Sequence, residues 1–381
     1  MSADRSNSLL MGATILGALG VLASALLVEA PRFWANWIVW FLFLFTLALG
    51  ALFLVALEHL VGARWSVPLR RVPERIATLL IPLTAVALVA LGAVKVLYPG
   101  AKPEALHHKV LAGKALWLGL PFFSGRVVFF CALYLVALAV LVKGSLKQDQ
   151  SLDPQFNVRA KRFAPLFMAI FALGVTQIAF DWISGLEPEW YSDIFGVYVF
   201  AGAFLAGLAA TALSVLHLQD QGRLDGVKQD HLYNLGAFLF AFTVFWSYIG
   251  FAQYMLMWYG DMPDEIIWYK ARIEGPWLAA ALVLALTHFV IPFFALITRD
   301  AKADPRRLRR VAILMLAAHF LDIYWLIFPV VSRRPVFSWP ELSFALLFLG
   351  GSLLWLRRSM ALGQDMPAGD PFLREGLEFH L

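Results

Sequence analysis

The sequence predicts an all-α integral membrane protein with ten transmembrane helices. Of its 381 residues, 61% are hydrophobic and only 15% are charged. Soluble domains are about 45–50% apolar and about 25% charged, so this chain has too few polar residues to cover a water-exposed surface. The apolar residues gather in ten runs, most of them long enough to cross the hydrocarbon core as helices. The basic residues are also divided unequally between the connecting segments, as in multi-pass membrane proteins.

The ten apolar runs define the expected spans in chain order. They cover roughly residues 9–28, 35–57, 76–97, 126–142, 163–183, 194–216, 232–257, 276–297, 310–330 and 342–356. The fourth and tenth runs are short and can extend by several residues. The first run resembles a signal sequence with Ala-Ser-Ala at 23–25, but it stays apolar through Val28, so we interpret it as an uncleaved span. We therefore expect one membrane domain over residues 1–360 and a C-terminal tail at 361–381.

The basic residues predict the orientation of the chain. Ten spans put both termini on one face of the membrane, and the segments on that face hold 21 of the 31 lysines and arginines, against ten on the opposite face. Cytoplasmic segments carry the excess of basic residues in multi-pass proteins. Both termini and the tail are therefore predicted to be cytoplasmic. The net charge of +5 reports this topology and does not require a nucleic acid or another anionic partner.

The cysteine content excludes several kinds of site. Cys131 is the only cysteine, so the chain has no disulfide framework, no thiolate set for an iron–sulfur cluster, no c-type haem attachment motif and no zinc knuckle. We expect Cys131 to be a small core residue and predict no metal site.

A few ionisable side chains within the spans are the candidates for chemistry. They are Asp181 near the outer end of the fifth span, His288 in the eighth, and His319 with Asp322 in the ninth. A charge at the bilayer centre costs roughly 2.5–3.5 kcal/mol, so such residues usually pair or have a function. His319 and Asp322 are three residues apart and share a helix face, where they can hydrogen-bond or share a proton. Gln177 lies one turn below Asp181. We interpret these five residues as a proton relay with Asp181 as its outer exit. Interhelical hydrogen bonding is the structural alternative, and haem ligation by the two histidines is another.

A relay also needs titratable groups near the two membrane faces. Candidates for the cytoplasmic end are Glu58, His59, His217, Asp230 and His231, and candidates for the outer end are Glu187 and Glu189. Each of these residues, taken alone, is also typical of a solvated helix terminus.

Aromatic residues are concentrated in the two outer loops and beside them. They are Trp182, Trp190, Tyr191, Trp258, Tyr259, Trp268 and Tyr269. Tryptophan and tyrosine form belts at membrane interfaces, and aromatic anchors beside charges are also typical of protein interfaces. The loops are therefore either an interfacial belt or a docking surface for a periplasmic partner.

Two stretches of the sequence resemble a known family. Residues 180–191 read Phe-Asp-Trp-Ile-Ser-Gly-Leu-Glu-Pro-Glu-Trp-Tyr, and residues 251–261 read Phe-Ala-Gln-Tyr-Met-Leu-Met-Trp-Tyr-Gly-Asp. They are similar to the F membrane subunit (ActF) of bacterial alternative complex III, the quinol:cytochrome c (electron acceptor) oxidoreductase of respiratory electron transport chains. The segments from His288 to Pro292 and from His319 to Trp325 fit the same family in order. The resemblance covers about residues 160–330 and is loose before that.

The resemblance implies a fold like the NrfD-like, polysulfide-reductase-type membrane subunits. It implies one four-helix bundle at about 35–183, a second at about 194–330, and peripheral first and last helices. It further implies a place in the bacterial inner membrane, in contact with lipid, a paralogous quinol-binding subunit, a periplasmic iron–sulfur subunit and c-type haem subunits. Haem c and iron–sulfur centres would then belong to the partners, with no cofactor held by this chain, although quinol remains an open ligand. The expected function is a non-redox subunit that provides a proton-conducting bundle and a docking platform. A stand-alone secondary transporter and a quinol-binding subunit of the same complex are the alternatives.

Overall fold

The computed structural model describes residues 3–381, and the side chains of residues 3–5, 110 and 264 lie outside the described part. Within this range there is no strand, and ten helical segments are long and apolar enough to cross a membrane. These segments are Ser6–Leu27, Ala30–Val61, Arg71–Leu97, Leu120–Ser151, Gln155–Leu186, Phe195–Asp220, Gln229–Tyr259, Trp277–Leu296, Pro305–Val330 and Trp339–Met360. The predicted all-α fold with ten candidate transmembrane helices is confirmed.

Several spans are made of more than one helical element. The long helices are α1 (Ala3–Leu27), α2 (Ala30–Val61), α4 (Leu80–Ala90), α8 (Leu120–Leu138), α10 (Gln155–Gln177), α11 (Phe195–Asp220), α12 (Gln229–Tyr259), α13 (Pro263–Ile273), α14 (Trp277–Ala285), α17 (Pro305–Ile327) and α18 (Trp339–Met360). The shorter α-helices are α3 (Arg71–Ala77), α5 (Val94–Leu97), α6 (Lys109–Ala112), α7 (Ala115–Leu118), α9 (Gly144–Ser151), α15 (Ile291–Leu296), α16 (Arg299–Ala303) and α19 (Leu373–Glu378). Three π-helical turns are η5 (Ala139–Lys143), η6 (Ile178–Ile183) and η8 (Leu286–Val290). The 3₁₀ turns are η1 (Val67–Leu69), η2 (Leu91–Ala93), η3 (Pro99–Ala101), η4 (Pro103–His107), η7 (Ser184–Leu186) and η9 (Phe328–Val330).

The helices are longer than the apolar runs that predict them. The second span was expected at 35–57 and is Ala30–Val61, and the fourth was expected at 126–142 and is Leu120–Ser151. Hydropathy identifies only the apolar part of a helix, whereas the backbone hydrogen bonds of the helix continue into the polar residues at each of its ends. The helix α2 stops at Gly62, which takes the left-handed conformation (φ 66°) typical of a helix C-terminus.

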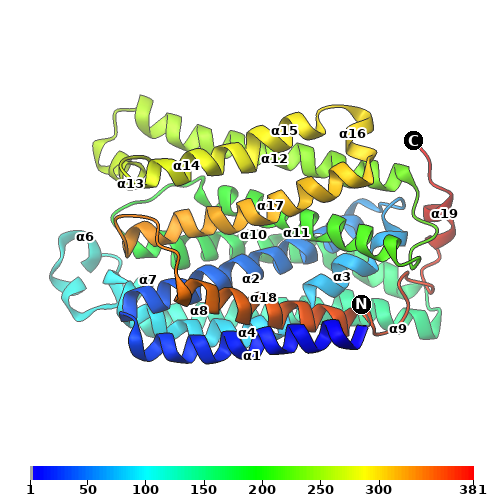
Figure 1. Ribbon diagram of the computed structural model, residues 1–381, viewed down its shortest axis with the longest axis horizontal. Coiled ribbons are helices and arrows are strands. Elements are labelled where there is room, and N and C mark those ends of the chain that lie inside the picture. The colour runs from blue at the N-terminus through cyan, green and yellow to red at the C-terminus, as the bar shows by residue number, and fades with distance from the viewer. Residues whose placement is uncertain (1–2) are drawn as a thin grey trace.

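The helices α2 and α11 pack against each other at the centre of the molecule (Figure 1). Their close approach depends on two glycines. A Cβ at Gly50 would lie 2.0 Å from the Ala203 carbonyl oxygen, and a Cβ at Gly207 would lie 2.5 Å from the Ala51 nitrogen. Any larger residue at these positions would force the two central helices apart.

The other spans group around these two helices. Helices α4 and α10 pack on α2, and α8 packs on both α4 and α10, while α12 and α17 pack on α11 and α14 packs on α17. Helices of spans two to five thus contact one another, as do those of spans six to nine, and α2 and α11 join the two sets. Helices α1 and α18 pack along each other at the periphery, and both touch α2 (Figure 1).

Both termini lie at the same end of the molecule (Figure 1), and the C-terminal tail is bound to that end by ion pairs. Asp365 lies 3.0 Å from an Arg75 nitrogen and 2.6 Å from an Arg223 nitrogen, and Asp370 lies 2.5 Å from an Arg70 nitrogen. Burial acts to raise the pKa of Asp365, but the hydrogen bonds from Arg223 and Arg75 outweigh it and hold that pKa below its usual value. These ion pairs therefore hold the C-terminal tail against this end of the helical bundle.

At the opposite end, the aromatic loops pack partly on each other. The Trp190 and Trp268 rings stack with centroids 4.2 Å apart, and the guanidinium of Arg272 lies 3.8 Å from the Trp268 ring centroid while it pairs with Glu187. Of the seven aromatic residues noted in the sequence, Trp182, Trp190, Trp268 and Tyr269 are buried, and Tyr191, Trp258 and Tyr259 are exposed. Only the exposed three are free to serve as a belt or a docking surface, because the other four hold the loops together.

Candidate functional site

The three deepest ionisable residues singled out in the sequence lie together. His288 is in η8, and His319 and Asp322 are in α17. Their side chains are buried, with exposures of 0%, 2% and 2%. One nitrogen or oxygen atom from each residue lies within 4.8 Å of the corresponding atoms of the other two. The structure therefore brings together three side chains that the sequence singles out in the eighth and ninth spans.

The π-helical turn at His288 has a local cause. Pro292 has no backbone N–H to donate to the carbonyl of residue 288, and in a regular α-helix its ring would clash with that carbonyl. The helix widens at this point, as π-helical turns do, often at functional sites. The His288 ring then packs on Trp246, with ring centroids 3.9 Å apart.

Asp322 accepts hydrogen bonds from two other helices. The Tyr198 hydroxyl of α11 donates to Oδ1 at 2.5 Å, and the Trp246 indole N–H of α12 donates to Oδ2 at 3.2 Å. Asp322 therefore ties α17 to α11 and α12. His319 and Asp322 share a helix face as expected, but the direct hydrogen bond that their spacing allows is not formed, because each side chain has its partners on other helices.

The contacts of His319 suit one tautomer of its ring. Its Nε2 lies 2.9 Å from the Thr46 hydroxyl oxygen, which also lies 2.7 Å from the Leu42 carbonyl oxygen. In the tautomer with a hydrogen on Nε2, the ring donates to the hydroxyl, which donates in turn to the carbonyl. In the neutral ring Nδ1 is then a proton acceptor, and this buried atom has no hydrogen-bond partner in the described part of the chain.

Gly202 of α11 borders the space between His319 and Asp322. A Cβ at this position would lie 3.3 Å from His319 Nδ1 and 3.7 Å from Asp322 Oδ2. Because Gly202 has no side chain, no methyl group presses on His319 Nδ1 and Asp322 Oδ2, the two atoms between which a proton would pass. An alanine here would press on the imidazole and force it to shift by a few tenths of an ångström.

The cluster is chemically suited to holding and passing a proton. Both ring nitrogens of His288, like Nδ1 of His319, lack a hydrogen-bond partner among the described residues. A separation within 4.8 Å is one that a single water molecule spans by donating to one group and accepting from another. Two imidazoles and a carboxylate could in principle also attract zinc. Donor atoms around a tetrahedral zinc stand about 3.3 Å apart, as bond lengths of ~2.0–2.1 Å require, and the three ligand atoms of the cluster lie within 4.8 Å of one another.

Gln177 and Asp181 form a separate group. Asp181 is fully buried and accepts from Gln177 Nε2 at 2.8 Å, Trp117 Nε1 at 3.0 Å and Arg126 Nε at 2.8 Å. The Arg126 guanidinium also lies 4.0 Å from the centroid of the Trp117 ring. Among the described side chains, no hydrogen bond joins this group to His288, His319 or Asp322. Asp181 is thus an ion-paired carboxylate of the fifth span, and its role as an exit remains a prediction.

The predicted end residues occupy varied environments. Glu58 and His59 are buried at the end of α2, and His231 is buried and contacts the Gly376 carbonyl at 2.9 Å. His217 contacts Gln221 at 3.0 Å, Asp230 lies in the first turn of α12, Glu187 pairs with Arg272, and Glu189 lies 3.3 Å from His108. No hydrogen bond between described side chains leads from these residues to the central cluster.

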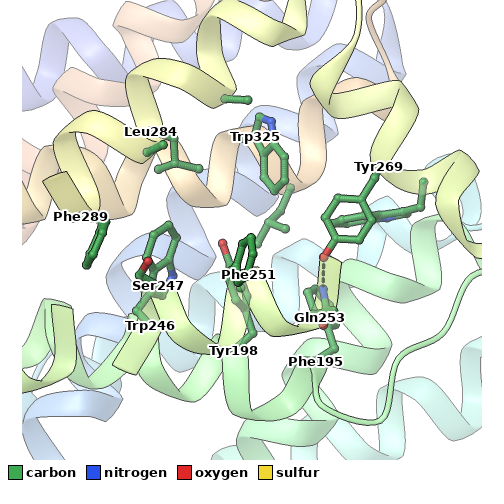
Figure 2. Close-up of a pocket in the computed structure, with 15 residues that line it drawn as sticks. Phe195, Tyr198, Trp246, Ser247, Phe251, Gln253, Tyr269, Leu284, Phe289 and Trp325 are labelled. Atoms are coloured by element: carbon green, nitrogen blue, oxygen red, sulfur yellow. Dashed lines mark hydrogen bonds between the residues drawn. The ribbon is translucent and has the colours of Figure 1, made fainter. Parts of the chain in front are cut away.

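An aromatic cavity of about 250 Å³, whose lining residues are drawn in Figure 2, lies beside the residues that donate to Asp322. Tyr198 and Trp246, which donate to Asp322, form part of its wall, and Phe251 and Phe289 are further lining residues. Gln253 donates to the Tyr269 hydroxyl at 2.7 Å (Figure 2). Burial raises the pKa of Tyr269, so this phenol stays protonated and can donate into the cavity.

Several residues of the site were not predicted from the sequence. Three of them, Tyr198, Trp246 and Thr46, lie in apolar spans. Such residues are common in helix packing, so the sequence did not indicate that their polar atoms belong to a site. Gly202 is one of 27 glycines. Arg126 was counted only for topology, although an arginine at the edge of an apolar run is itself a sign of a buried ion pair.

Neither the comparison with protein-family models nor the comparison with curated proteins gives a match.

Proposed function

We propose that this chain is a proton-conducting membrane subunit of a quinol-oxidising respiratory complex, and that His288, His319 and Asp322 form its central proton-holding site. The observation that carries this proposal is the meeting of three buried titratable side chains, three of whose ring nitrogens have no hydrogen-bond partner among the described residues. Buried polar atoms are nearly always hydrogen-bonded, and exceptions are often functional.

The arrangement supports a carrier role in two ways. Tyr198 and Trp246 stabilise the charged form of Asp322, so the carboxylate can exist in a site where an isolated charge would be costly. The free nitrogens of the histidines can then take up a proton and neutralise that charge. Moving one charge through 100 mV costs about 2.3 kcal/mol, so short steps between neighbouring groups are required.

The assignment to a quinol:electron-acceptor oxidoreductase is supported by the family resemblance of residues 160–330. With a single cysteine, the chain cannot supply the thiolates of an iron–sulfur cluster. Electron transfer would therefore belong to neighbouring subunits, namely a paralogous quinol-binding subunit, an iron–sulfur subunit and c-type haem subunits. The exposed Tyr191, Trp258 and Tyr259 would form part of the docking surface.

Purification in mild detergent tests this assignment. We expect the tagged full-length chain to elute with haem-containing and iron–sulfur subunits, detected by the haem absorbance and by iron analysis. A homogeneous single polypeptide whose thermal stability depends on a solute would contradict the proposal and support a stand-alone transporter. A tagged version of an unrelated ten-helix protein serves as the control for adventitious co-elution.

Quinol binding by this chain is the second candidate function. It is favoured by the aromatic cavity beside Asp322, because aromatic walls with a few polar groups suit a quinone ring, and Tyr198 links the cavity to the carboxylate.

A photoreactive quinone tests this second function. If the cavity binds the ring, labelling should map to peptides that contain Ser247 or Phe289, and Ser247→Trp should reduce it about tenfold by filling the space. Gly12→Trp is the control, because nothing lies within 4 Å of a Cβ at Gly12. Equal labelling of the two variants would exclude quinol from this cavity.

A further inference from the structure

A second cavity, of about 420 Å³, lies at the end of the molecule that carries the termini. It is formed by the end of α2, the segment that follows it and the first turns of α10, and Phe372 of the tail also lines it. Its polar lining residues are Glu58, His59, Arg64, Arg70, Asn157 and Lys161. The central proton site uses none of these side chains for a hydrogen bond.

Several buried polar atoms of this cavity have no hydrogen-bond partner among the described residues. Glu58 Oε2 and Arg70 Nε form a long ion pair at 3.9 Å, too far apart for a hydrogen bond, and neither atom has another hydrogen-bond partner among the described residues. The two residues are only 4% and 3% exposed. Asn157 Oδ1 and His59 Nε2 also lack partners. Because buried polar groups are rarely left without partners, these atoms indicate a ligand with both donors and acceptors.

The charges are divided between the inside and the rim of the cavity. Inside the cavity the atoms without a hydrogen-bond partner are the acceptors Glu58 Oε2 and Asn157 Oδ1 and the donor Arg70 Nε, whereas two further cationic side chains, Arg64 and Lys161, are exposed. Arg64 pairs with Glu375, whereas Lys161 forms no ion pair with a described residue. The cavity is therefore suited to a zwitterionic ligand, whose cationic group meets the acceptors Glu58 and Asn157 and whose anionic group meets the cationic side chains Arg70, Arg64 and Lys161.

The surface beside the rim is apolar and continues along α10. Val158 lines the cavity and is 41% exposed, and Leu166 and Leu173 are 58% and 67% exposed. Positions 158, 166 and 173 are eight and seven residues apart, so they lie on one face of the helix. This strip runs from the cavity along a membrane span, as the acyl chain of a bound lipid would.

We infer that this cavity binds the headgroup of a phospholipid that carries a primary ammonium, with the ammonium at Glu58 and Asn157 and the phosphate at Lys161 and Arg64. A primary ammonium has three N–H donors and satisfies both acceptors. A trimethylammonium group has no N–H and satisfies neither. A headgroup without a cation leaves the Glu58 carboxylate beside a phosphate, which is repulsive.

Lipid titration followed by native mass spectrometry tests this inference. The full-length chain, in the assembly in which it purifies, is delipidated and titrated with phosphatidylethanolamine, phosphatidylcholine or phosphatidylglycerol of identical acyl chains. We expect phosphatidylethanolamine to bind about tenfold more tightly than the other two, the effect of losing one charge-assisted hydrogen bond. Glu58→Gln should reduce this preference.

Lys161→Gln tests the phosphate contact without disturbing the core, because Lys161 is exposed. It should weaken phosphatidylethanolamine binding about tenfold, whereas Lys147→Gln, an exposed lysine outside the cavity, should not change it. Equal binding of the three lipids, or equal effects of the two lysine variants, would overturn the inference and leave water as the occupant. If soluble phosphoethanolamine competed for the cavity as strongly as the lipid does, the acyl chains would add nothing to binding, and the ligand would not be a lipid.

Discussion

Replacing Asp322 by asparagine should abolish proton translocation by the complex while its assembly and quinol oxidation persist. The amide has nearly the shape of the carboxyl group, and its oxygen can still accept from the Tyr198 hydroxyl. It cannot bind and release a proton, however, and among the described residues no other carboxylate belongs to the cluster. The measurement is the number of protons released per electron transferred, with the complex reconstituted in vesicles and quinol as the reductant.

The control for this variant is Asp225→Asn, which neutralises an exposed carboxylate outside the ten spans. It should leave the proton-to-electron ratio unchanged. Unchanged translocation in Asp322→Asn would refute the relay. Loss of the assembled complex would instead indicate that Asp322 serves mainly to join α17 to α11 and α12 through Tyr198 and Trp246, which is the structural alternative for a buried carboxylate.

The fold was predictable because its signal is repeated along the chain. Each span contributes its own apolar run, and no single residue decides the fold class. The ends of spans were less predictable, as the extension of the second span to Ala30–Val61 illustrates. Hydropathy carries no information about how far backbone hydrogen bonding continues into polar residues.

The site was only partly predictable, for a different reason. His288, His319 and Asp322 stood out because ionisable residues are rare within spans. Their partners Thr46, Tyr198 and Trp246 did not, because each contributes one polar atom on an otherwise ordinary side chain. Only the fold shows that these atoms meet at the cluster.

The basic residues illustrate a further limit of the sequence. They were counted as evidence of topology, yet many of them are structural. Arg64, Arg70, Arg75 and Arg223 all pair with acidic residues of the tail. A count of charges cannot distinguish an arginine that faces water from one that holds a segment in place.

Arg71→Met should lower the free energy of unfolding by about 3–5 kcal/mol, the usual effect of removing one partner from a buried ion pair. Arg71 is fully buried, and its guanidinium lies 2.7 Å from Glu74 and 2.5 Å from Asp149. It also donates to Ser145 at 3.1 Å. Methionine has similar length but no charge, so the Glu74 carboxylate, itself fully buried, would lose its cation.

Unfolding in detergent by a denaturant titration measures this effect, and Arg310→Met is the matched control. Arg310 is exposed, and surface substitutions usually change stability by less than about 0.5 kcal/mol. The double variant Arg71→Met, Glu74→Met should recover part of the loss, because apolar residues can replace a buried pair at little cost. If the double variant were as unstable as Arg71→Met, the loss would come from packing around Arg71. If Arg71→Met were as stable as the control, water must reach Glu74 and Asp149, and the end of the bundle beneath the tail would be open to solvent.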